Sequence, residues 1–163
     1  MPGGCSTFVV DYYVHRNFDY DYTENAAFLV KTPNYKGLAF IDGLHNRQMY
    51  NWDMDKVAQL PNRLVDGINE HGVFVSTHII YNDFNFAGYS GADAIPMHRL
   101  VSLILENCND LDELNTFIDA CKNKLSIPDT LKAAGYIASY FIKVHDNHFV
   151  FQINEAGTQY ELI

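Results

Sequence analysis

The chain has 163 residues, of which 48% are hydrophobic and 14% aromatic, so it is long enough to bury a core and is predicted to form one domain over residues 1–163. Its formal net charge of -9 opposes contact with a phosphate backbone or an anionic membrane surface, which excludes nucleic acid and membranes from the expected partners. The three cysteines lack the spacing of a disulfide framework, and no stretch resembles a signal peptide or an apolar run of about 20 residues. We therefore expect a cytoplasmic protein.

Residues 6–43 contain short runs of β-branched and aromatic residues, separated by the turn-forming segments Thr32-Pro33-Asn34 and Asp42-Gly43. This pattern predicts an antiparallel meander. Its four expected strands are Thr7–Val10, Tyr13–His15, Ala27–Thr32 and Leu38–Ile41.

The middle of the chain is less regular. Residues 53–66 have a weak helical pattern that Pro61 interrupts, and the turn-forming segment 66–72 leads into a strand at Val73–Ile80. Residues 81–91 mix turn residues with aromatics, which predicts a loop of the kind that can cover a pocket.

The last part of the chain is predicted to hold two amphipathic helices, a short helical turn around Pro128 and three strands. In order they are Ala94–Asn107, a helix capped by Asp110 that runs through Cys121, Ser126–Ala134, Tyr136–Val144, Phe149–Asn154 and Thr158–Ile163. Strands, then two helices, then strands predict an α+β domain in which helices cover one face of a mainly antiparallel sheet.

Cys5 stands at the start of the first predicted strand, and Arg16 and Asp19 belong to the segment expected to run antiparallel beside it. A thiol attacks as the thiolate, its ordinary pKa is about 8.5, and a nearby guanidinium favours the charged form. Removal of Met1–Gly4 would free an α-amine that can serve as the base for the same side chain. A cysteine at a strand start is nevertheless more often buried and inert. The assignment of Cys5 as a nucleophile therefore depends on whether its side chain lies close to those of Arg16 and Asp19 in the folded chain.

Three segments together resemble a known family. They are Cys-Ser-Thr-Phe at 5–8, Arg-Asn-Phe-Asp-Tyr-Asp-Tyr at 16–22 and Asp-Gly-Ile-Asn-Glu-His-Gly at 66–72. In order and spacing they are similar to the linear amide C–N hydrolases of the choloylglycine hydrolase family, within the N-terminal nucleophile superfamily. That family includes bile salt hydrolases and penicillin V acylases.

The resemblance implies an αββα fold, in which antiparallel sheets are layered with helices, and a cysteine hydrolase that needs no cofactor and cleaves small-molecule amides. Carried over by motif position, Cys5 matches the nucleophile, Arg16 the arginine beside it, and Asp19 the aspartate that positions the nucleophile's amine. A backbone N–H near Ile79 or Ile80 would help to form the oxyanion hole.

Family members are considerably longer, and the asparagine and second arginine that complete their site have no match here. The chain therefore resembles an N-terminal half, whose sheets would present unpaired edges and an uncovered apolar face. One interpretation is a split enzyme that forms a homo-oligomer or pairs with a complementary C-terminal chain. The other is a catalytically inactive fragment or subunit that acts as a binding or structural partner.

The remaining candidates have competing interpretations. Phe84, Phe86 and Tyr89 are candidates for lining an acyl pocket, although packing of the loop on the core explains them equally well.

The seven histidines do not predict a metal site, because residues 145–148 resemble a hairpin turn and no His-Glu-x-x-His or paired Cys-x-x-Cys spacing occurs. Cys108 and Cys121 are expected to be small buried hydrophobic residues. Asn69 and Glu70 are expected to build a turn.

Overall fold

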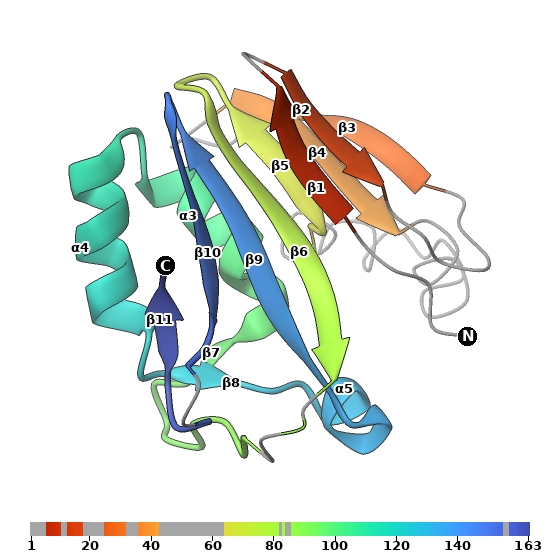
Figure 1. The fold of residues 1–163 in the computed structure, drawn as a ribbon, viewed down its shortest axis with the longest axis vertical. Helices are drawn as coiled ribbons and strands as arrows, with labels where there is room; N and C mark the ends of the chain where they lie inside the picture. The colour runs from red at the N-terminus through yellow and green to blue at the C-terminus, as the bar shows by residue number, and fades with distance from the viewer. Residues whose placement is uncertain are drawn as a thin grey trace.

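The structure is a computed structural model in which a seven-stranded antiparallel sheet carries helices on one face and a two-stranded hairpin on the other (Figure 1). The fold class is therefore α+β, as predicted. The structure describes residues 6–10, 13–17, 25–31, 36–42, 64–81, 83, 86–154 and 157–163.

The strands are β1 Ser6–Val10, β2 Tyr13–Asn17, β3 Asn25–Lys31, β4 Lys36–Asp42, β5 Asp66–Asn69, β6 Val73–Tyr81, β7 Ile95–Pro96, β8 Leu125–Ser126, β9 Tyr136–Val144, β10 Asn147–Ile153 and β11 Tyr160–Leu162. The helices are η2 Met97–Arg99, α3 Leu100–Asn107, α4 Leu111–Cys121 and α5 Asp129–Ala134. Each strand predicted from the sequence is present, with ends shifted by two residues or fewer. The helical pattern predicted over residues 53–66 lies outside the described residues up to residue 63, and residues 64–66 are not helical. The segment 66–72, predicted to be turn-forming, begins instead with strand β5. The turns predicted at 32–34 and at Gly43 lie outside the described residues.

The large sheet has the order β11-β10-β9-β6-β5-β4-β3, and the long central strands β6 and β9 pair from Val73 opposite Val144 to Tyr81 opposite Tyr136. The predicted meander is wrong in one respect, because β1 and β2 pair with each other in a sheet of their own while β3 and β4 join the large sheet. Turn residues fix which neighbouring strands form a hairpin, but they carry no information about which sheet that hairpin joins.

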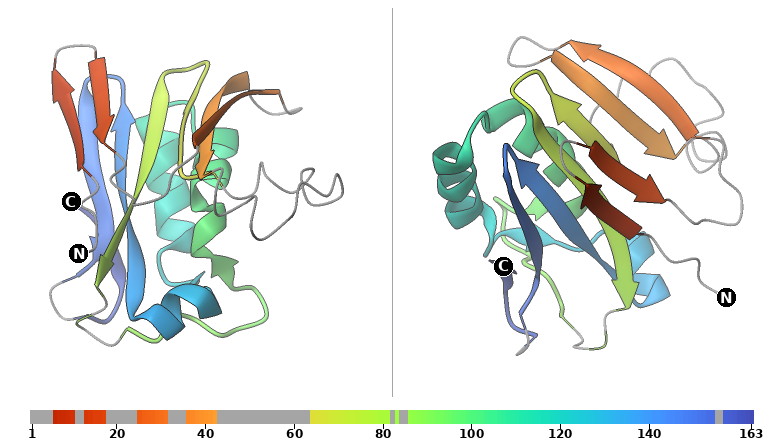
Figure 2. Two further views of the ribbon diagram at one scale, coloured as in Figure 1. Left: turned by 90° about the vertical axis from the view of Figure 1, so that its right-hand side faces the viewer. Right: turned by 45° about the horizontal axis from the view of Figure 1, so that its top comes forward.

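The helices α3 and α4 cover the face of the large sheet that is opposite to the hairpin (Figure 2). Their buried residues form one core with the strands, including Val75, Leu100, Ile104, Leu114, Ile118, Ile142, Phe151 and Tyr160. The helix α4 begins as predicted, because the Asp110 carboxylate accepts a hydrogen bond from the Glu113 N–H at 2.9 Å. The predicted start of α3 at Ala94 is wrong, since Pro96 favours extended backbone at Ile95 and the chain forms β7 and η2 first.

Asn69 connects the β5–β6 turn to the end of α3. Its Nδ2 donates to the carbonyl oxygens of Leu105 at 3.1 Å and Cys108 at 2.9 Å. Its Oδ1 accepts from the N–H groups of His71 at 3.1 Å and Val73 at 3.0 Å. The buried amide therefore uses both of its donors and accepts two bonds, which confirms the interpretation of Asn69 as a turn residue with a structural role.

Cys108 and Cys121 are buried, and burial raises the pKa of each thiol to about 12. Neither is therefore a second nucleophile, as expected. Among the described residues, no group of three or more His, Cys, Asp or Glu side chains is arranged to hold a metal ion. None of the described helices has the length and apolar character needed to cross a membrane.

Candidate functional site

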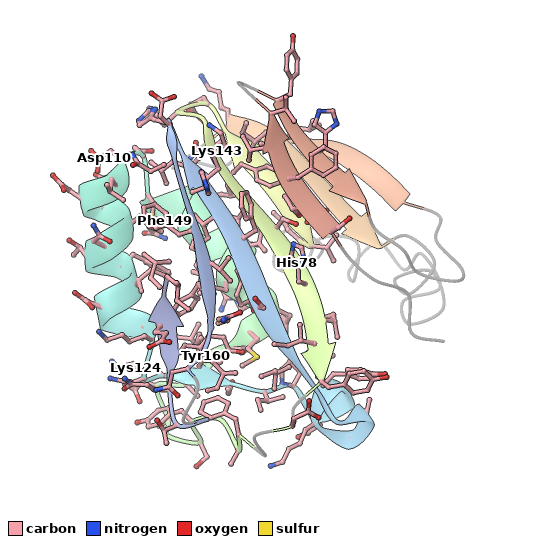
Figure 3. All side chains as sticks on the ribbon, viewed as in Figure 1. His78, Asp110, Lys124, Lys143, Phe149 and Tyr160 are labelled. Atoms are coloured by element: carbon pink, nitrogen blue, oxygen red, sulfur yellow. The ribbon has the colours of Figure 1, made fainter. Side chains whose placement is uncertain are left out.

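The two faces of the large sheet carry different side chains where β6 crosses it. Residues alternate between the faces of a strand, so Val73 and Val75 point into the helix-side core while Ser76 and His78 lie on alternate positions to them. On this second side Thr7 of the hairpin approaches the sheet, with its Oγ1 2.9 Å from Nε2 of His78 and 3.2 Å from Oγ of Ser76. Figure 3 shows His78 on β6 next to the end of the hairpin where β1 begins.

Two further buried polar residues lie on the same face. Asp66 of β5 is directly opposite Ser76, and Ser139 of β9 is directly opposite His78. Residues that are directly opposite each other in an antiparallel pair point to the same side of the sheet. We call this set the interlayer polar cluster: Thr7, Asp66, Ser76, His78 and Ser139. It combines a carboxylate, an imidazole and three hydroxyl groups between two layers, where an apolar contact would be the ordinary arrangement. These groups can orient a polar reactant or transfer a proton.

The predicted nucleophile and its acidic partner, Cys5 and Asp19, lie outside the described residues. The strand β1 begins at Ser6, immediately after Cys5 in the sequence. Arg16 belongs to β2, where its backbone is directly opposite Thr7. Position 16 is therefore on the same side of the hairpin as Thr7, the side that approaches the interlayer polar cluster.

The two oxyanion candidates differ in the direction of their backbone N–H groups. Along an antiparallel strand these groups point alternately to the neighbour on either side. Thr77 donates to the Val65 carbonyl at 2.8 Å, so the N–H of Ile79 also points to the β5 side of β6. The N–H of Ile80 points instead into the ladder with β9, where Ile80 is opposite Ile137.

The aromatic candidates lie away from the interlayer polar cluster. Phe84 is outside the described residues. The Phe86 ring packs edge-on against Tyr160, with ring centroids 5.7 Å apart, and Tyr160 belongs to the helix-side core. Tyr89 is exposed at the surface, where its hydroxyl donates to Asp93 at 2.9 Å and Asp93 also pairs with Lys124 at 2.9 Å. Figure 3 shows Tyr160 and Lys124 well separated from His78.

Sequence reasoning did not identify Thr7, Ser76 or His78 as site residues. A weak signal was present, because the polar run Ser76-Thr77-His78 interrupts an otherwise apolar strand. Positions 76 and 78 share one face of the strand, but the intervening Thr77 hides the period of two that would mark a polar face.

Comparisons with known proteins give a limited result. No protein-family profile matches the chain, and no curated protein sequence matches it. Among solved structures, the chain is similar to the penicillin V acylase from Agrobacterium tumefaciens, with a TM-score of 0.48 and 11% sequence identity. The match covers 83% of this chain and 38% of the acylase chain. An identity of 11% does not indicate a shared activity.

Proposed function

We propose that the chain is part of an N-terminal nucleophile hydrolase that cleaves linear amide C–N bonds with Cys5. The observation that carries the proposal is the attachment of β1 to β6. Cys5 immediately precedes β1, and the Thr7 hydroxyl bonds to His78 at 2.9 Å and to Ser76 at 3.2 Å. The position of Arg16 opposite Thr7 supports a guanidinium close to the thiol. Within this proposal the domain is the first half of an αββα fold.

The proposed reaction begins after removal of Met1–Gly4. The Cys5 thiol transfers its proton to the freed α-amine, and the thiolate sulfur attacks the amide carbonyl carbon to form a tetrahedral oxyanion. The C–N bond then breaks, the α-ammonium returns the proton to the leaving amine, and an acyl thioester remains. Water attacks the thioester, with the α-amine as base, and releases the carboxylic acid and the thiol.

Each proposed side chain serves one of these steps. Arg16 stabilises the thiolate by its positive charge, and Asp19 orients the α-amine by accepting a hydrogen bond from it. Ile79 is a better oxyanion donor than Ile80, because its N–H points away from the β6–β9 ladder. The substrate is a small-molecule amide. Phe86 and Tyr89 lie away from the interlayer polar cluster, so the proposal does not assign them to the acyl group.

We include in the proposal that the chain self-associates or pairs with a complementary chain through the outer face of the hairpin. On that face Phe8, Val10 and Tyr13 are 53%, 50% and 71% exposed. Exposed apolar patches of this kind mark protein contacts. Sedimentation velocity is expected to show an oligomer that Tyr13→Ser weakens and that Tyr81→Ser, at another exposed tyrosine, leaves intact. A monomer at working concentration contradicts this part of the proposal.

The central test is chemical. The expressed chain is analysed by intact mass, with and without iodoacetamide, and is assayed against a bile salt conjugate, penicillin V and an N-acyl amine. We expect a species that lacks Met1–Gly4, carries one label on Cys5 and hydrolyses at least one substrate once a complementary chain is supplied. Cys5→Ser should abolish labelling and turnover with an unchanged circular dichroism spectrum, while Cys121→Ser retains both. An unprocessed chain without label or turnover refutes the proposal.

A further inference from the structure

We propose that Thr7 and His78 are positioning residues that hold the start of β1 against β6 and thereby set the position of the residue before it. This inference rests on the proposed function for its chemical consequence, but the attachment itself is tested independently. Thr7 and His78 are 71 positions apart in the sequence, and their side chains meet at 2.9 Å between the layers.

The hairpin depends on side chains for its attachment. In the described part of the chain β1 pairs through its backbone with β2 alone, so the hairpin and the large sheet are separate ladders. An isolated two-stranded hairpin is marginally stable in water. Its inner face must therefore be fixed by contacts with the sheet, and the two hydrogen bonds of Thr7 are such contacts.

The network can satisfy its polar atoms in two proton arrangements. In one, the Thr7 hydroxyl donates to Nε2 of His78 and accepts from the Ser76 hydroxyl. In the other, Nε2–H of His78 donates to Thr7, and Thr7 donates to Ser76. Because a hydroxyl both donates and accepts, Thr7 keeps two partners whichever ring nitrogen of His78 carries the proton.

The attachment point is close to the proposed nucleophile along the chain. Thr7 follows Cys5 by two residues, so the chain between them can span at most about 7 Å. Misplacement of a catalytic group by about 1 Å can lower a rate about 100-fold. A loosened Thr7 should therefore affect the chemistry more than the overall fold.

The first experiment measures hydrogen exchange of the β1 and β2 amides in the whole chain. Thr7→Val keeps the shape of the side chain without its hydroxyl, and His78→Phe keeps a planar ring without its nitrogens. Both should raise the exchange rates of these amides about tenfold, a change equivalent to about 1.4 kcal/mol. Thr7→Ser and His78→Gln retain a hydrogen-bonding group and should restore the protection. His148→Phe, at an exposed position of β10, is the matched control and should change nothing.

The second experiment follows the alkylation rate of Cys5 against pH in the chain that lacks Met1–Gly4. A thiolate held near Arg16 titrates below the ordinary thiol pKa of about 8.5. Thr7→Val and His78→Phe should move the midpoint of the profile toward that value, and Thr7→Ser should restore it. The deeply buried Cys108 and Cys121 should not react under the same conditions.

The outcomes separate the two hypotheses. Unchanged exchange in Thr7→Val and His78→Phe overturns the positioning role. If the variants change the hydrogen exchange of the β1 and β2 amides but leave the midpoint of the Cys5 alkylation profile unmoved, the link to the thiol is overturned. Changed exchange in variants of a protein whose wild-type midpoint is already ordinary means that the proposed function fails, while the attachment by Thr7 and His78 stands.

Discussion

Asn69 offers a direct test of how the β5–β6 turn is held to the helix layer. Asn69→Ala removes four hydrogen bonds, two donated to carbonyls of Leu105 and Cys108 and two accepted from backbone N–H groups. At about 1 kcal/mol for each bond, we expect the free energy of unfolding to fall by about 4 kcal/mol. For a chain of this size that corresponds to a lower melting temperature by about 8–16 °C.

The assay is urea denaturation followed by circular dichroism, with Asn107→Ala as the matched control. Asn107 also donates its Nδ2 to a carbonyl, that of Leu103 at 2.7 Å, but its bond is exposed to solvent. We expect the control to change the free energy of unfolding by about 0.5 kcal/mol or less. Equal losses in the two variants would refute the reasoning, because they would show that burial of the Asn69 network contributes nothing.

Asn69→Asp adds a pH dependence. The substituted carboxylate keeps the two accepted bonds but places oxygen against the carbonyls of Leu105 and Cys108, which favours its protonated form and raises its pKa in the folded state. Ionisation of the introduced carboxyl therefore does not destabilise the variant below the ordinary aspartate pKa of about 3.9. The destabilisation grows as the pH rises through the pKa that this carboxyl has in the folded state. Denaturation midpoints of this variant and the wild type, measured from pH 3 to pH 8, should diverge with rising pH; parallel curves contradict the argument.

Three other outcomes follow from the described contacts. Thr7→Val should lower the free energy of unfolding by about 1–3 kcal/mol, because it leaves the buried hydroxyl of Ser76 without this partner. In a double-mutant cycle, Thr7→Val combined with Ser76→Ala should recover part of that loss, and strictly additive losses argue against the contact. Cys108 and Cys121, with pKa values of about 12, should react with iodoacetamide at pH 8 in urea but not in the native protein, as counted by mass spectrometry. Bonds from Lys124 and Tyr89 lower the pKa of the Asp93 carboxyl, so its small contribution to stability is present above the unfolded pKa and is lost as the pH falls through the folded value; Asp93→Asn should flatten that part of the stability profile in acid denaturation.

Local signals were sufficient for most of the secondary structure. The Asp110 cap lies one residue before the helix that it starts. A turn separates β9 from β10 within the predicted segment 145–148, although β10 begins two residues earlier than predicted, at Asn147. Each of these features depends on neighbours within about four residues, the range over which caps and tight turns act. The early start predicted for α3 is wrong for the same local reason, since the helical period was read through Pro96.

The interlayer polar cluster required tertiary information. Thr7 lies 69 and 71 positions from its partners Ser76 and His78, and Asp66 and Ser139 join them through two different neighbouring strands. A period of two reveals that a strand has a polar face, but it does not reveal what covers that face. The separate pairing of β1 and β2 was missed for this reason as well.

The two faces of the hairpin carry different side chains. The inner face is polar where Thr7 approaches Ser76 and His78, whereas the outer face exposes Phe8 and Tyr13 to solvent. The inner face also carries Val9, which is half-buried and directly opposite Val14, so apolar burial contributes to its packing as well. The Thr7 hydroxyl is part-buried between the layers, and its hydrogen bonds to Ser76 and His78 offset the cost of removing these polar groups from water. Under the proposed function, Cys5 directly precedes this attached strand, so Cys5 is the position at which the proposed chemistry should be tested first.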